Sequence, residues 1–245
     1  MTRALVVGGA SGIGAALVEL HRARGDDVVV WDAVATEGVV ACDVRDDGAV
    51  AAAAQALVDA GALPTQITIT AGVGSAGTIL KADRARWDDV LAVNVGGVVS
   101  VLRHLGGALV AAGQPASFVV TTSVSGTLVD RGMGAYCASK AAADMVVKVA
   151  AAELGEHGIR VNAVAPGVTR TPMVPVPDDS PWLTAVRQRT ALGRIGSADQ
   201  VAQAALALHD LEWVTGAILP ADGGLSLHSP IDSWGSTPGG TRPIS

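Results

Sequence analysis

Aromatic side chains are scarce in this chain of 245 residues, which has one tyrosine, one phenylalanine and five tryptophans. Cysteine is scarcer still, and neither Cys42 and Cys137 nor the five scattered histidines show the spacing of metal ligands. The sequence therefore indicates neither a disulfide framework nor a metal site.

Charge is also sparse. Only 16% of the residues are charged, the formal net charge is -6, and the 17 basic residues form no cluster, so we do not expect nucleic acid as a partner. Apolar stretches are too interrupted by glycine and charge for a membrane span, and Met1-Thr2-Arg3 leads straight into a strand-like run with no room for a signal peptide. We expect a soluble protein with no membrane partner, located in the cytoplasm.

Short apolar runs alternate with longer helical patterns along the chain. Strands are predicted at 4–7, 28–31, 66–70, 117–122, 159–165 and 216–219, and helices at 12–24, 46–60, 83–112, 134–154 and, after an N-cap at Ser197, to about 208. This alternation predicts an α/β fold with one doubly wound parallel sheet and helices on both faces. The length suits a single domain, 1–224, followed by a C-terminal tail, 225–245.

Two connections differ from the rest. Only ten residues separate Asp32 from Asp43, fewer than a helical crossover needs, so this connection is predicted to be a loop. Four prolines lie within 172–181, which excludes regular structure and predicts a mobile lid with a short helix near 182–190.

A phenol and an ammonium group stand four residues apart at Tyr136 and Lys140, inside an alanine-rich, helix-favouring run. On a helix they are neighbours, so the lysine charge is expected to lower the pKa of the tyrosine from about 10 and let it exchange protons near neutral pH. The same spacing also occurs where a helix only packs a tyrosine beside a lysine. Here the context favours chemistry, because Ser123 ends a strand upstream and the chain opens with the glycine-rich turn Gly8-Gly9-Ala10-Ser11-Gly12-Ile13-Gly14.

In this order, the turn, the serine and the Tyr-x-x-x-Lys pair resemble the short-chain dehydrogenase/reductase family, from about residue 3 to Gly224. The short second crossover is similar to that of the bacterial NAD-dependent hydroxysteroid dehydrogenase/carbonyl reductase type. The resemblance implies a single Rossmann-type domain, a nicotinamide-dependent oxidoreductase, and a homo-oligomer, either a tetramer or a dimer.

The resemblance also implies a catalytic set. Ser123 would hydrogen-bond the substrate oxygen, Tyr136 would act as general acid or base, Lys140 would bind the nicotinamide ribose, and Asn94 would hold a water that relays protons to Lys140. An asparagine that bonds a nearby backbone group is the alternative reading of Asn94, which stands in an apolar helical run.

Cofactor-binding residues follow from the resemblance and from chain position. The glycine-rich turn is expected to bring the backbone and a helix N-terminus to the pyrophosphate. Asp32, about 20 residues further on, would accept hydrogen bonds from the adenosine ribose and repel a 2′-phosphate, which predicts NAD rather than NADP. The predicted set is Gly8, Ser11, Gly12, Ile13, Gly14, Asp32, Asp43, Val44, Ala71, Gly72, Tyr136, Lys140, Pro166, Gly167, Val168 and Thr171.

Two positions depart from the family pattern. Val7 stands where the family usually has threonine before the first glycine, and Ile69-Thr70 stands where it commonly has Asn-Asn before Ala-Gly. The hydrogen bonds of that threonine and of those asparagines are therefore missing from the prediction.

The residues expected around the substrate are mostly apolar: Val73-Gly74, Val124-Ser125, 129–134, Met173, Val174, Val176 and Trp182. They favour a hydrophobic secondary alcohol or ketone, unless Arg131 or Arg187 turns inward to bind an anion. The leading hypothesis is an NAD-dependent alcohol dehydrogenase or carbonyl reductase. The alternatives are an NADP-linked 3-oxoacyl-thioester reductase, which Asp32 disfavours, and a non-catalytic nicotinamide-sensing module, which the complete catalytic set disfavours.

Apolar surface also predicts assembly. The predicted helices 83–112 and 134–154 carry more small apolar residues than one core can use, which favours a homo-oligomer. In the tail, the apolar part 225–234 is predicted to pack at a subunit interface near the lid or, equally, over its own domain, and the rest is rich in Gly, Pro, Thr and Ser.

Overall fold

The computed structural model describes residues 2–227 of the chain. Within them, seven strands form one sheet in the order β3-β2-β1-β4-β5-β6-β9, with every neighbouring pair parallel. They are β1 Arg3–Val7, β2 Asp27–Asp32, β3 Val40–Ala41, β4 Gln66–Ile69, β5 Ala116–Thr121, β6 Ile159–Pro166 and β9 Ile218–Ala221. The short strands β7 Thr169–Arg170 and β8 Gly196–Ser197 pair separately.

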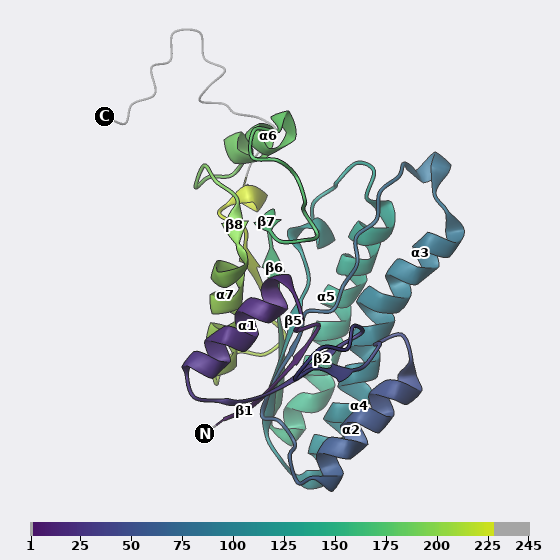
Figure 1. The fold of residues 1–245 in the computed structure, drawn as a ribbon, viewed down its shortest axis with the longest axis vertical. Helices are drawn as coiled ribbons and strands as arrows, with labels where there is room; N and C mark the ends of the chain where they lie inside the picture. Colours follow the sequence, from purple (N-terminus) through teal and green to yellow (C-terminus); the bar gives the residue numbers. More distant parts are fainter. Residues whose placement is uncertain (1, 228–245) are drawn as a thin grey trace.

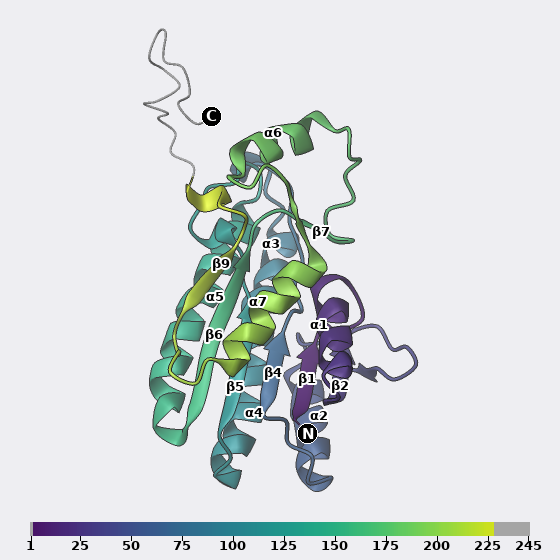
Figure 2. The same cartoon turned by 90° about the vertical axis from the view of Figure 1, so that its left-hand side faces the viewer.

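Helices cover both faces of the sheet, which confirms the predicted doubly wound α/β fold (Figure 1). α1 Gly12–Ala23 and α7 Ala198–Asp210 pack together on one face. α2 Asp47–Asp59, α4 Gly97–Ala112 and α5 Gly134–Leu154 cover the other, next to α3 Arg84–Leu91. Figure 2 shows α7 crossing in front of the strands and α6 Pro181–Arg189 above their carboxyl ends.

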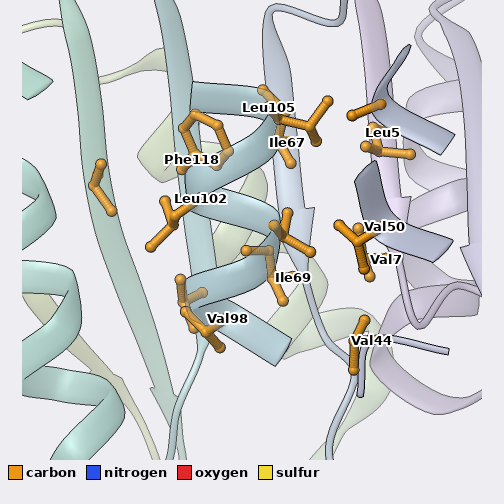
Figure 3. Packing of buried hydrophobic residues seen from close by; sticks show 14 of the residues in the cluster. Leu5, Val7, Val44, Val50, Ile67, Ile69, Val98, Leu102, Leu105 and Phe118 are labelled. Carbon is orange, nitrogen blue, oxygen red and sulfur yellow. The ribbon is translucent and has the colours of Figure 1, made fainter. Parts of the chain in front are cut away.

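The strands are apolar along their length because helices bury both sides of the sheet. The larger core lies between the sheet and α2, α4 and α5, where Leu5, Ile67 and Phe118 have no exposed surface (Figure 3). The segment Arg84–Ala112 is long and apolar enough to cross a membrane by length and composition. Its α4 residues Leu105 and Leu109 are fully buried in this core, so the segment packs as a core helix of the domain.

Three boundaries differ from the sequence prediction. The helix predicted over 83–112 consists of α3, a π-helical turn at Ala92–Gly96, and α4. The predicted loop between Asp32 and Asp43 is confirmed, but it contains the two-residue strand β3, and β9 begins two residues later than predicted. Residues 172–180 lack regular structure as predicted, and the short helix after them is confirmed as α6, which begins at Pro181. The mobility of this lid stays a prediction.

The strand order reverses between β1 and β4, because the chain leads from β1 outward to β2 and β3 and then returns to β4. In an open α/β sheet, ligands bind in the crevice outside the carboxyl ends of the strands at such a point. The loops after β1, β4, β5 and β6 therefore surround the candidate site.

Candidate active site

A cavity of about 1220 Å³ opens at the carboxyl ends of these strands, beneath the lid. Every predicted cofactor-binding residue lines it, and so do Ser123, Met173, Val174, Val176 and Trp182. Among the predicted catalytic residues, Asn94 is the one that does not line this cavity. The structure thus brings together segments that are up to 218 residues apart in the chain, because Val7 and Leu225 lie on its wall.

The glycine-rich turn after β1 is packed too closely for side chains. Gly8 has a φ of 84°, and a Cβ on it would lie 2.5 Å from the backbone nitrogen of Ala71. A Cβ on Gly14 would lie 2.1 Å from the carbonyl oxygen of Gly8. The turn is held to β2 by the hydrogen bond from the Gly8 N–H to the Trp31 carbonyl, 2.7 Å. This cradle and the adjoining N-terminus of α1 fit a pyrophosphate.

Thr70 supplies the hydrogen bonds that the sequence comparison left missing beside this turn. Its hydroxyl lies 2.9 Å from the carbonyl oxygen of Val7 and 2.8 Å from that of Gly8, and its own N–H donates to Val7 at 2.7 Å. The hydroxyl of the residue that follows β4 therefore hydrogen-bonds to the glycine-rich turn, as a threonine at position 7 does in the family pattern.

Asp32 ends β2 beside the turn. Its Oδ2 accepts the Ala10 N–H at 3.0 Å and its Oδ1 accepts the Val34 N–H at 3.1 Å, so two backbone groups fix the carboxylate at the cavity wall. Neither contact uses a basic side chain, which leaves the carboxylate negative toward a ligand.

Asp43 also lines the cavity, but its carboxylate is taken by Arg45. The guanidinium donates to Asp43 at 2.6 Å and to Asp89 at 2.8 Å. The side-chain hydrogen bond from Arg45 holds the pKa of Asp43 below its usual value. Arg45 is thereby paired with two carboxylates at the cavity wall.

Ser123 and Tyr136 meet across the cavity, from the end of β5 and the first turn of α5. The Ser123 hydroxyl accepts the Ser125 N–H at 3.1 Å and lies 3.5 Å from the Pro166 carbonyl oxygen, and its hydrogen-bonding influence lowers the pKa of Tyr136. The backbone N–H of Tyr136 donates to the Ser75 hydroxyl at 3.1 Å, a contact that the sequence analysis missed. An alcohol oxygen can be held between these two hydroxyls.

The expectation that Lys140 lowers the pKa of Tyr136 is wrong for this structure. Burial raises the pKa of Tyr136, and Asp130 and Cys137 add to the rise, although the Ser123 hydrogen bond opposes it. Burial also lowers the pKa of Lys140, to about 8, against the opposing charge of Asp144. The amine donates to the Thr121 carbonyl at 3.0 Å and lies 5.5 Å from the centre of the Tyr136 ring. Both groups are therefore held toward their neutral forms.

Asn94 lies in the π-helical turn, and its side chain bonds the backbone of the loop after β4. Its Oδ1 accepts the Val73 N–H at 2.8 Å, and its Nδ2 donates to the Val73 carbonyl at 3.0 Å and to the Ser139 hydroxyl at 2.9 Å. A Cβ on Gly72 would lie 3.3 Å from Asn94 Oδ1 and 3.5 Å from Lys140 Nζ, so the two side chains flank that glycine. The backbone-bonding reading of Asn94 is confirmed, and the water relay stays a prediction.

The lid residue Asp178 has two arginine partners that the sequence analysis did not pair. Arg170 donates to its carboxylate, and Arg187 donates to its carboxylate at 3.1 Å and to its carbonyl at 2.9 Å. Arg187 is thus held within the lid and does not line the cavity, whereas Arg131 does. No signal in the sequence pairs these residues, because the contact depends on how the prolines fold the lid.

Comparison with known proteins agrees with this geometry. A family model described as enoyl-(acyl carrier protein) reductase matches residues 8–226. Galactitol 2-dehydrogenase (L-tagatose-forming) of Cereibacter sphaeroides is 35% identical over 91% of this chain and 94% of its own. A 2,5-dichloro-2,5-cyclohexadiene-1,4-diol dehydrogenase of Sphingobium indicum is 35% identical over 91% of this chain and 96% of its own.

Among solved structures, aldohexose dehydrogenase of Thermoplasma acidophilum superposes with a TM-score of 0.86 at 26% identity, covering 97% of both chains. The relatives are dehydrogenases of alcohols, so the chain is an oxidoreductase that works with a nicotinamide cofactor. The fold, the cavity and these likenesses agree that the chain belongs to the short-chain dehydrogenase/reductase family.

Proposed function

We propose that the protein is an NAD-dependent dehydrogenase that interconverts a secondary alcohol on a largely apolar molecule and its ketone. The observation that carries the proposal is the Ser123–Tyr136 hydroxyl pair, with Lys140 beside it, in a cavity whose wall also bears the Asp32 carboxylate. The apolar lining formed by Val124, Val174 and Trp182 supports an apolar substrate.

The residues present fit a nicotinamide dinucleotide, since the cavity is large enough and its glycines leave room for a close backbone approach. When bound, the nicotinamide ring supplies the hydride acceptor or donor. Ser123 then orients the substrate oxygen, and Tyr136 gives its proton to that oxygen during reduction or, as tyrosinate, takes the proton from it during oxidation. Lys140 would hold the cofactor ribose, and Asn94 would hold a water that relays protons to Lys140.

NAD is proposed over NADP because of charge. Asp32 is fixed by two backbone N–H groups, so it stays directed at the cavity, and Arg45 is already paired with Asp43 and Asp89. A 2′-phosphate would meet a carboxylate at Asp32, and the charge of Arg45 is already balanced by two carboxylates.

The test is steady-state kinetics of purified protein with NAD and with NADP against a panel of secondary alcohols, read as absorbance of the reduced cofactor. We expect turnover with NAD, its loss in Tyr136→Phe, and NAD binding retained in that variant. Turnover of Tyr136→Phe near the wild-type rate, or a wild-type preference for NADP, would contradict the assignment.

We also propose a homotetramer in the cytoplasm. Val99 on α4 and Met145 and Val149 on α5 are apolar yet 44%, 58% and 47% exposed, which supports burial of these helices against another copy. Light scattering at micromolar concentration tests the assembly, and a monomer mass would refute it. The proposed interface role of 225–234 lies mostly outside the described residues and is tested by truncation after Gly224.

A further inference from the structure

Four carboxylates line the cavity, at Asp32, Asp43, Asp89 and Asp130. Backbone N–H groups hold Asp32, and arginines hold both Asp43 and Asp89. Asp130 differs, because the one hydrogen bond to its carboxylate within residues 2–227 comes from the Ser125 hydroxyl at 2.5 Å. A carboxylate has about four acceptor positions, so Asp130 keeps acceptor capacity toward the cavity.

Hydrogen bonds connect Ser125 and Asp130 to the Ser123–Tyr136 pair. Ser125 is 8% exposed, and its N–H donates to the Ser123 hydroxyl while its own hydroxyl donates to Asp130. Hydrogen bonds from Met133 to the Asp130 carbonyl and from Gly77 to the Gly132 carbonyl fix the turn that carries Asp130. The carboxylate therefore has a defined place two hydrogen bonds away from the hydroxyl that orients the substrate oxygen.

We infer that Asp130, oriented by Ser125, is a specificity-determining residue that accepts a hydrogen bond from a second hydroxyl of the substrate, so that the substrate is a diol. The inference rests on the proposed function and narrows its substrate class. A carboxylate at the cavity wall attracts a hydroxyl donor, and a substrate with a single hydroxyl leaves it without a ligand contact.

The relatives are consistent with this reading, since the named substrates of two of them, galactitol and a cyclohexadiene diol, carry more than one hydroxyl. The inference explains why the wall next to Tyr136 bears a negative charge even though that charge makes the tyrosine harder to ionise. A charge that disfavours the catalytic group is understandable where it binds the substrate.

The test compares molecules with the same ring: cyclohexanol, cyclohexane-1,2-diol and cyclohexane-1,4-diol, each with NAD and the full-length protein. One diol should have a kcat/KM about 10- to 100-fold above that of cyclohexanol, the range of a hydrogen bond to a charged group. Asp130→Ala and Asp130→Asn should remove this preference, and Ser125→Ala should reduce it, so that the ratio of the diol kcat/KM to the cyclohexanol kcat/KM falls toward one.

Thr127→Ala is the matched control. Thr127 lies in the same loop and bonds the Val124 carbonyl at 3.1 Å, but it does not line the cavity, so its loss should keep the diol preference. Kinetics are read on the pH plateau, because removal of the Asp130 charge also affects Tyr136, and that effect acts equally on all three alcohols.

Equal kcat/KM for cyclohexanol and both diols in the wild type would overturn this inference and leave the proposed function intact. A diol preference that survives in Asp130→Ala, or that Thr127→Ala also abolishes, would overturn it as well. If none of the three alcohols, nor any other secondary alcohol, is oxidised, the proposed function fails together with it.

Discussion

Tyr136 is the one tyrosine of the chain, so an absorbance titration of tyrosinate reports its pKa without interference from another phenol. We expect this pKa to lie above the ordinary value of about 10 in the protein without cofactor, because burial is its largest influence. We also expect Lys140→Met to change it little. Lys140, with a pKa of about 8, has released its proton before the tyrosine begins to ionise, so no cation faces the phenolate.

The size of the difference makes the test decisive. If the ammonium group remained charged, the 5.5 Å that separates it from the Tyr136 ring centre would give an attraction of about 3 kcal/mol at an effective dielectric constant of about 20. That energy corresponds to about 2 pKa units. Removing the lysine would then raise the pKa of the tyrosine by about that amount.

The assay is near-ultraviolet absorbance between neutral and alkaline pH for the wild type, Lys140→Met and Ser123→Ala, with circular dichroism to confirm that the fold persists. Ser123→Ala should raise the pKa of Tyr136 further, since it removes the hydrogen bond that lowers it. A wild-type pKa below 10, or a rise of about 2 units in Lys140→Met, would refute the reasoning. The same titration with NAD present measures how far the cofactor changes this pKa.

Three further predictions concern the cofactor turn, the core and the lid. Thr70→Val should lower the free energy of unfolding by about 1 kcal/mol and weaken NAD binding, whereas Thr70→Ser should keep the stability and the affinity. Chemical unfolding and cofactor titration measure the two effects, and an unchanged NAD affinity in Thr70→Val would contradict the prediction. His209 is 4% exposed and bonds Thr68 and Ser117 at 2.8 and 3.0 Å, and burial lowers its pKa to about 3, below the unfolded value of about 6.5. The contribution of His209 to stability is therefore complete above pH 6.5, and it should fall by about 1.4 kcal/mol per pH unit as the pH drops toward 3. Urea unfolding of the wild type and of His209→Asn at pH 7 and pH 5 measures this fall. An equal loss of stability in both proteins would contradict the prediction. Asp178→Asn should loosen the lid by weakening its bonds to Arg170 and Arg187, and so raise KM for the alcohol more than it lowers kcat; an unchanged KM would show that the contact does not position the lid.

The elements that the sequence predicted well are those with a local cause. The apolar runs of β1 and β5 and the capping residues Ser197 and Asp46 define their strands and helices without reference to the rest of the chain. The catalytic positions were predictable for the same reason, since the spacing from Ser123 to Tyr136 and Lys140 is a property of the chain. The fold then places all three at one cavity.

The features that the sequence did not predict depend on tertiary surroundings. Helical spacing places Lys140 beside Tyr136, but the sign of their pKa shifts depends on burial, which the spacing does not contain. The π-helical turn at Asn94 has no signature in a run that reads as continuous helix. It accompanies the hydrogen bonds to Val73, a residue of another loop.

Val7 and Thr70 show how two departures from a pattern can cancel. β1 and β4 are neighbours with Val7 opposite Ile69, so residue 70 stands beside the turn that begins at Gly8. A hydroxyl from either strand can reach the carbonyls of that turn, and here the valine on β1 is compensated by the threonine that follows β4. Taken separately, Val7 and Thr70 each depart from the family pattern at a polar position. Because the strand register places them side by side, the hydrogen bond to the turn is retained. Residues at the carboxyl ends of adjacent parallel strands are therefore best compared with a family pattern in pairs, because the sheet places them within one hydrogen bond of each other.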